Sequence, residues 1–177
     1  MADAKKRPGQ ISVGATLSST SHIFPAMIEQ KAGIKFKYVS YEGLAPRMNA
    51  ILGGHIHLTD SNLTQKGKVD AGQLKFLAIA SEKRDATMPS VPTLKELGVD
   101  IVYEVVRGLL VPKGTPAAAR AKLAEACGKA VEDPEFAEAM RKQGTRNDFA
   151  GEKEYGAFLD KIDAEKEARI LQLVYQL

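Results

Sequence analysis

Residues 11–33 read ISVGATLSSTSHIFPAMIEQKAG and predict a strand, a loop and a helix in succession. The apolar residues 11–13 are typical of a short strand, and Gly14 permits a tight turn after it. An apolar run over 23–32 predicts the helix, which Gly33 ends. The hydroxyl-bearing residues between the strand and the helix are of the types preferred at a helix N-cap.

The start of the predicted helix is a candidate anion-binding site. The first backbone N–H groups of a helix lack partners within the helix, and the helix dipole adds partial positive charge there. Together with the loop hydroxyls, these donors suit a carboxylate or a phosphate. The candidate ligand-binding residues of this loop are Thr16, Ser18, Ser19, Thr20, Ser21 and His22. The competing interpretation is a well-capped helix without a ligand.

The composition is that of a folded protein without a nucleic-acid partner. A length of 177 residues with 44% hydrophobic residues suffices for one or two domains with a buried core. The net charge is only +3, and aromatic residues make up 6% with no Trp, which argues against a nucleic-acid-binding surface. No apolar run is long enough to span a membrane, and the N-terminal residues carry no secretory signal. A mature exported protein and a cytosolic protein share these properties.

The order of the elements predicts a mainly parallel α/β sheet followed by helices. We expect further strands over 34–39, 56–59 and 74–80, the last of them covered on both faces because it is almost entirely apolar. Helices between the strands, such as 44–52, complete a β-α-β-α-β-α-β pattern. After a β-branched stretch over 101–111, the remaining chain has a helical pattern.

Several phrases along the chain occur together in one protein family. They are PG (8–9), SSTSH (18–22), YEG (41–43), LGGHI (52–56) leading into SNL (61–63), AGQLK (71–75), VPTLKELG (91–98) and RGLLVPKGTP (107–116). In this order they make the chain resemble the substrate-binding receptors of tripartite tricarboxylate transporters, also called Bug-type solute receptors, over residues 8–172. The last two phrases are the most specific.

The resemblance implies a type 2 periplasmic-binding-protein fold, in which two α/β lobes close on a small carboxylate. The carboxylate (a dicarboxylate, a tricarboxylate or an acidic amino acid) would pass to the transporter's membrane subunits, in the periplasm and without a cofactor. The family's ligand loop matches residues 16–22 in a form one residue shorter, with Leu17 and Ser18 in place of the family's usual small, glycine-type residues. The ligand-binding residues implied by the family's two other polar turns are Tyr41, Gly43, Asp60, Ser61 and Asn62.

The resemblance also implies a chain in three parts. Residues 1–9 are a polar tail, which we expect to be solvated. Residues 10–105 are an α/β ligand-binding lobe, and residues 106–177 contain a hinge strand and C-terminal helices, the last predicted over 152–174. In the family these helices pack on the first lobe, which begins well upstream and is mostly missing from this sequence.

One lobe alone should bind a carboxylate weakly. A charge-assisted hydrogen bond contributes about 1.5–3 kcal/mol, and one lobe offers about three of them. Binding costs roughly 4–15 kcal/mol in lost freedom, whereas micromolar affinity needs about 8 kcal/mol net. We therefore expect a complementing lobe from another chain, or a homo-oligomer, to complete the site.

Enzymatic interpretations of single residues are weaker. His22 lies near several serines, but no motif supplies a nucleophile elbow or an orienting acid for a catalytic triad. His55 and His57 share one strand face and would need further ligands to bind a metal. Cys127 lies among Ala and Leu residues and fits a core position. Arg107 either pairs with a neighbouring carboxylate or reaches the ligand. We therefore expect no enzymatic activity.

A regulatory module is the main alternative function. Effector domains of some transcription regulators share the two-lobed fold, so a ligand-sensing role without transport would use the same site. No helix-turn-helix pattern precedes Pro8, however. A degenerate relative without an independent function is a third interpretation.

Overall fold

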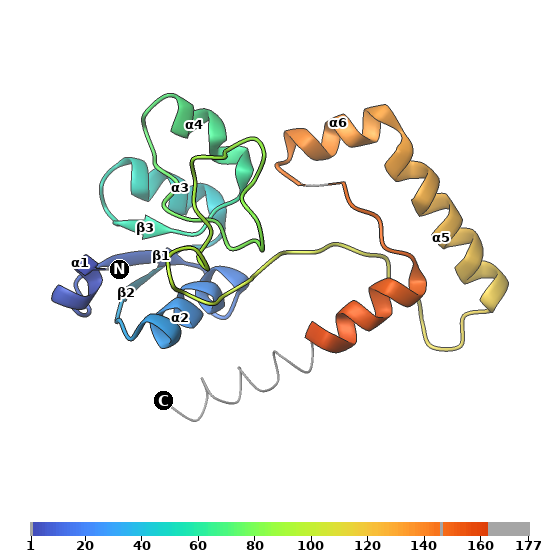
Figure 1. Cartoon of the computed structure of the whole chain (residues 1–177), viewed down its shortest axis with the longest axis horizontal. Helices are drawn as coiled ribbons and strands as arrows, with labels where there is room; N and C mark the ends of the chain where they lie inside the picture. Colours follow the sequence, from blue (N-terminus) through green and yellow to red (C-terminus); the bar gives the residue numbers. More distant parts are fainter. Residues whose placement is uncertain (1, 146, 163–177) are drawn as a thin grey trace. The chain divides into compact units, whose positions relative to one another are not determined.

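The computed structural model describes residues 2–145 and 147–162, which fall into two compact units that divide after Arg107 (Figure 1). The first unit is α/β and the second contains helices, which confirms the predicted α/β sheet followed by helices. The predicted C-terminal helix over 152–174 is helical as far as residue 162, and its remainder lies outside the described residues. The predicted part boundaries after residues 9 and 105 stay predictions.

Three parallel strands form the central sheet in the order β2-β1-β3. The strands are β1 (Ser12–Ala15), β2 (Lys37–Ser40) and β3 (Leu58–Thr59). β1 lies in the middle, and its Val13 is in register with both Tyr38 and Leu58. Every residue of β1 is buried, as expected for a strand with a neighbour on each side.

Gly14 lies inside β1, where the absence of a side chain makes room for a neighbour. A Cβ at this position would lie 2.5 Å from Cδ1 of Ile56, well inside van der Waals contact. The tight turn predicted at Gly14 is therefore wrong, because β1 continues to Ala15. Close packing, and not backbone freedom, explains this glycine.

Helices connect the parallel strands. α2 (Thr20–Ala32) begins after the N-cap Ser19 and ends at Gly33, whose φ of 61° is a left-handed conformation that glycine adopts without strain. α3 (Leu44–Leu52) has the bounds that the sequence predicted. The helices that follow β3 are the short 3-10 helix η1 (Leu63–Gln65) and α4 (Lys66–Asp70). The core against which α2 packs contains Met27, Leu94, Val99 and Ile101.

The N-terminal residues pack on the first unit instead of forming a solvated tail. α1 (Ala2–Lys6) is a short helix whose Ala4 is buried in a cluster with Ile11 and Ile34. The other residues of α1 are exposed, which accounts for the polar sequence.

The predicted strand over 74–80 is wrong. The segment contains one isolated bridge, between Ile79 and Thr93, and no ladder. Leu77 is 57% exposed, so the segment is not covered on both faces. A strand needs a hydrogen-bonding neighbour along its length, and an apolar composition does not supply one. The β-branched stretch 101–111 is likewise not a strand.

The second unit has helices but little interior. α5 (Ala117–Glu132) is followed directly by α6 (Pro134–Lys142), and Asp133 caps α6 by accepting two backbone N–H groups of its first turn. Residues 152–162 are also helical. None of the described residues of this unit is buried, and Cys127, predicted in a core, is only partly buried. Among the described helices of the chain, none is long and apolar enough to cross a bilayer.

We predict that Gly14→Ala lowers the free energy of unfolding by about 1–3 kcal/mol, because the added methyl group overpacks a buried strand. Gly67→Ala in α4 is the matched control, since no atom lies within 4 Å of the Cβ that it would add. The control should change stability by less than about 1 kcal/mol. Urea denaturation measures both variants. Equal stability of the two would contradict the close packing of Ile56 on β1.

Candidate functional site

All three strands end at the same edge of the sheet because they are parallel. The loops that follow them meet there, and we call this edge the carboxyl-edge rim: residues 16–19, 41–43 and 60–62. The rim and the first turn of α2 together contain every predicted ligand-binding residue: Thr16, Ser18, Ser19, Thr20, Ser21, His22, Tyr41, Gly43, Asp60, Ser61 and Asn62. These residues differ in how many of their polar groups the protein itself already uses.

Thr16 joins the first two loops of the rim. Its Oγ1 donates to the carbonyl oxygen of Tyr41 at 2.8 Å and accepts from the backbone N–H of Gly43 at 3.1 Å. Gly43 has a φ of 92°, so a side chain at this position would be strained. The Thr16 hydroxyl therefore positions the two loops and is not available to a ligand.

Ser19 and Ser21 also use their hydroxyls within the loop. Ser21 is 2% exposed, and its Oγ accepts from the backbone N–H of Thr16 at 2.9 Å. Ser19 Oγ donates to the carbonyl oxygen of Thr16 at 2.7 Å, lies 2.8 Å from Ser21 Oγ, and accepts from the Ser21 N–H at 3.2 Å. These bonds cap α2 and fix the loop, so both residues are positioning residues.

The donors left over lie at the tip of this loop. The backbone N–H groups of Leu17 and Thr20, and the hydroxyls of Ser18 and Thr20, form no hydrogen bond with any described residue. Ser18 and Thr20 are exposed, and Ser18 has a φ of 60°. His22 Nδ1 accepts from the Ser18 N–H at 3.4 Å, which supports the tip from behind. Residues 17–20 thus offer hydrogen-bond donors and contain no carboxylate.

Arg47 holds the other loops together and was not predicted. It lies in α3, is 6% exposed, and its Nε donates to the carbonyl oxygen of Gly43 at 3.1 Å. Its Nη1 donates to Thr59 Oγ1 at 3.2 Å and forms an ion pair with Asp60. Asp60 is therefore the counterion of Arg47, which removes an uncompensated negative charge from the rim. The sequence feature that could have indicated this role is that Arg47 is the sole charged residue of α3.

Asn62 and Ser61 form the third loop of the rim. Asn62 is the N-cap of η1, and its Oδ1 accepts from the backbone N–H of Thr64 at 3.2 Å. The Nδ2 group of Asn62 has no hydrogen-bond partner among the described residues. Ser61 Oγ makes only a long bond to the carbonyl oxygen of Asn62, at 3.4 Å. Both residues are exposed and keep donors that can face a ligand.

Behind His22, Tyr38 of β2 pairs with Glu29 of α2. The Tyr38 hydroxyl donates to Glu29 Oε2 at 2.9 Å, while Glu29 Oε1 accepts from the backbone N–H of Phe36. The rings of His22 and Tyr38 meet edge to face with centroids 4.7 Å apart. Burial, followed by the negative charge of Glu29, raises the pKa of the Tyr38 hydroxyl well above its usual range. This pair anchors α2 on the sheet below the rim.

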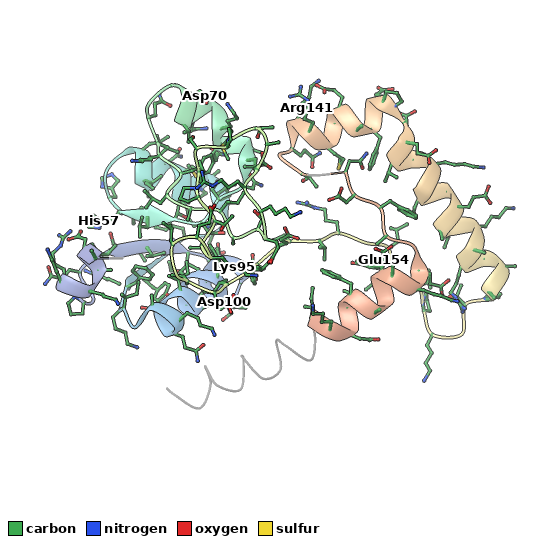
Figure 2. The ribbon with its side chains drawn as sticks, in the orientation of Figure 1. His57, Asp70, Lys95, Asp100, Arg141 and Glu154 are labelled. Atoms are coloured by element: carbon green, nitrogen blue, oxygen red, sulfur yellow. The ribbon has the colours of Figure 1, made fainter. Side chains whose placement is uncertain are left out.

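The opposite edge of the sheet carries His57 (Figure 2). The backbone N–H of Ser12 donates to His57 Nδ1 at 3.1 Å, and the Ser12 hydroxyl lies 2.6 Å from the same nitrogen. The His57 N–H donates back to the carbonyl oxygen of Ser12 at 3.1 Å. The imidazole thus fixes the start of β1 against β3. Within the described part of the chain, no three His, Cys, Asp or Glu side chains come close enough together to hold a metal ion.

Comparisons with known sequences point to one family. The family model described as "Tripartite tricarboxylate transporter family receptor" matches residues 1–174. The "UPF0065 protein in gbd 5'region" of Cupriavidus necator is 34% identical over 174 residues, which cover 98% of this chain and 53% of that protein. The chain therefore spans about half the length of this curated relative.

Solved structures agree with this match. A TctC solute binding protein from Polaromonas superposes with a TM-score of 0.81 at 34% identity, over 97% of this chain and 59% of that one. The R. palustris protein Rpa4515, solved with adipate, gives a TM-score of 0.77 at 25% identity, over 94% of this chain and 57% of that one. These matches confirm the predicted periplasmic-binding-protein-like fold.

We predict that Arg47→Met lowers the free energy of unfolding by about 3 kcal/mol or more, because it leaves Asp60 and the Gly43 carbonyl without their partner. Arg141→Ala is the control. Arg141 lies on α6 (Figure 2), and its ion pair with Glu138 is exposed, so its loss should cost less than about 1 kcal/mol. Urea denaturation compares the two variants. Similar losses for both would show that Arg47 does not hold the rim.

A second prediction concerns Tyr38. Because its pKa is raised in the folded state, unfolding releases the phenol proton above the unfolded pKa of about 10, and stability falls as pH rises past that value. Tyr38→Phe removes this group, so its stability should fall less steeply than that of the parent between about pH 9 and pH 11. Burial also raises the pKa of the Tyr103 hydroxyl, so the stability of the variant still falls with pH, but with a smaller slope. Denaturation at several pH values measures both slopes, and identical slopes would contradict the role of Tyr38.

Proposed function

Because this chain belongs to the tripartite tricarboxylate transporter receptor family, we propose that it captures a small carboxylate at the carboxyl-edge rim for delivery to the transporter's membrane subunits. The family is one of solute receptors and not of enzymes, and its receptors are periplasmic. We propose the same compartment for this protein. The chain spans about half of its curated relative, so the activity of the whole receptor is part of the proposal.

The unpaired donors at the loop tip carry this proposal. The N–H groups of Leu17 and Thr20 and the hydroxyls of Ser18 and Thr20 belong to neighbouring residues at the N-terminus of α2, where the helix dipole favours negative charge. Arg47 forms an ion pair with Asp60, one of the two carboxylates of the rim. The other carboxylate, that of Glu42, is exposed to solvent. Each of these donors can form a charge-assisted hydrogen bond with a carboxylate group.

The predicted ligand-binding residues then take two roles. Ser18, Thr20 and Asn62 contact the ligand, together with the backbone at Leu17. Thr16, Ser19 and Ser21 position the loop, and Arg47 positions the neighbouring loops. Tyr41, Gly43 and Asp60 contribute through their backbone and through the Arg47 ion pair, whereas His22 supports Ser18. Donors fixed before binding reduce the entropy that binding costs.

We propose a dicarboxylate as the ligand. The R. palustris relative at 25% identity was solved with adipate, a dicarboxylate. One carboxylate would lie at the loop tip and the chain of the ligand would extend past Asn62. Since one lobe contributes about three charge-assisted bonds of about 1.5–3 kcal/mol each, the proposal includes a complementing lobe for tight binding.

The experiment is an NMR titration of the ¹⁵N-labelled protein with adipate, which detects weak binding. We expect the largest shifts at the amides of Leu17 and Thr20. Thr20→Pro removes the Thr20 N–H at the first helical position, where proline is tolerated, and the extended backbone of Ser19 suits a following proline. This variant should bind at least about tenfold more weakly. Thr20→Ala, which keeps the N–H, is the control and should lose less.

Hexane-1,6-diamine has the same length as adipate and the opposite charge. Shifts at the loop tip with the diamine and none with adipate would overturn the anion-binding proposal. Equal affinities of Thr20→Pro and the parent for adipate would show that the Thr20 N–H does not contact the ligand.

A further inference from the structure

Lysine side chains gather around the amino ends of the strands. Helix α2 returns the chain from the carboxyl end of β1 to the amino end of β2, so its last turn lies at the amino edge of the sheet. Helix α1 packs at the same edge, because its Ala4 shares a buried cluster with Ile11 and Ile34 (Figure 1). These segments carry five lysines, which we call the amino-edge lysine patch: Lys5, Lys6, Lys31, Lys35 and Lys37.

The lysines of the patch face solvent around this buried cluster, and all five are exposed. Phe36 packs against the cluster, whereas Lys35 and Lys37 on either side of it are exposed. Successive side chains of an extended segment alternate between its faces, so these two lysines share the outer face. The backbone N–H of Gly9 donates to the carbonyl oxygen of Lys35 at 2.9 Å, which joins the residues after α1 to this segment.

The positive charge of the patch is not balanced by acidic side chains. None of its five lysines forms an ion pair with a residue that the structure describes. In other parts of the chain, Lys66, Lys95 and Lys129 each pair with a carboxylate. Residues 1–40 contain six basic and two acidic residues, although the net charge of the whole chain is only +3. The net positive charge of the protein is therefore concentrated at this edge.

The two acidic residues of this stretch already have partners. Asp3 forms an ion pair with Arg7 within four residues of the chain. Glu29 accepts hydrogen bonds from the backbone N–H of Phe36 and from the Tyr38 hydroxyl. Both carboxylates are thus held by neighbouring groups, and neither forms an ion pair with a lysine of the patch.

A patch of this kind fits an extended anionic surface. Its lysines come from three segments, and each ammonium group is a point charge on a flexible stem, which does not require one fixed geometry of the partner. Arg7 could bind a single phosphate with two hydrogen bonds, but its guanidinium pairs with Asp3. The low aromatic content, 6% with no Trp, disfavours a nucleic acid. A bilayer with anionic phospholipids presents phosphates over a wide area and attracts clusters of about four to eight basic residues.

We propose that the amino-edge lysine patch binds the surface of an anionic lipid bilayer. The attachment is electrostatic and reversible, because ammonium groups meet lipid phosphates without inserting into the apolar layer. The patch and the carboxyl-edge rim lie at opposite edges of the same sheet, so the attachment does not occupy the rim. This inference goes beyond the proposed function and requires no bound carboxylate.

The test is co-sedimentation of the full chain with vesicles of phosphatidylcholine that contain about 30% phosphatidylglycerol. We expect binding to these vesicles at about 20 mM salt. Binding should be at least about tenfold weaker to vesicles of phosphatidylcholine alone, which have no net charge. It should also be at least about tenfold weaker at about 300 mM salt, because salt screens the attraction between exposed charges.

Two variants with the same net charge locate the contact. The patch variant carries Lys5→Gln, Lys35→Gln and Lys37→Gln. The control variant carries Lys75→Gln, Lys83→Gln and Lys113→Gln, at lysines that are exposed and outside the patch. The patch variant should bind the anionic vesicles at least about tenfold more weakly than the parent, and the control should stay within about threefold of it.

Circular dichroism verifies that both variants keep their helices. If the patch variant does not, a variant with only Lys35→Gln and Lys37→Gln replaces it, because this pair leaves α1 unchanged. It should bind the anionic vesicles at least about fivefold more weakly than the parent.

Several outcomes would overturn the inference. They are no binding to the anionic vesicles at low salt, binding that salt does not weaken, and equal losses for the patch and control variants. Tighter binding of poly-L-glutamate than of the vesicles, at the same concentration of anionic groups, would also overturn it, because the partner would then be an acidic polypeptide.

The rim variant separates this inference from the proposed function, since a lipid phosphate could instead meet the donors of the loop tip. Thr20→Pro should bind the anionic vesicles as the parent does, and a loss as large as that of the patch variant would overturn the inference. The patch variant should bind adipate as the parent does. Vesicle binding at the patch without adipate binding would contradict the proposed function alone, and the reverse result would contradict this inference alone.

Discussion

The buried guanidinium of Arg47 is the constraint on which the rim depends. Burying a charge is costly unless every partner is in place, and the partners of Arg47 come from the loops after β2 and β3. Thr16 ties the loop after β1 to the loop after β2. The three loops therefore cannot move independently. A rim held in this way presents its donors in a fixed geometry before any anion arrives.

Hydroxyl groups at this rim do two different kinds of work. Ser19 and Ser21 bond to each other and to the backbone of Thr16, and they cap α2. Ser18 and Thr20, next to them in sequence, project from the tip without partners in the described chain. Burial follows the same division, because Ser18 and Thr20 are exposed, Ser19 is partly buried and Ser21 is buried.

Local sequence patterns predicted the parts of the fold that local forces decide. α3 and the succession of a strand, a loop and a helix over residues 11–33 follow from apolar periodicity and capping chemistry, and the structure confirms them. The strand predicted over residues 74–80 was wrong because a strand needs a partner that composition does not reveal. At the site, capping chemistry predicted the loop before α2, and the resemblance to the family implied the other two loops. The internal use of Ser21 and the role of Arg47 could not, because both depend on contacts between residues distant in the sequence.

The imidazole of His57 and the backbone of Ser12 meet at the amino ends of the strands, on the other side of the sheet from the candidate rim. Strand registry is thus secured away from the loops that would meet a solute. The contacts that fix this registry involve none of the rim residues, so a change of rim side chains would leave these contacts in place.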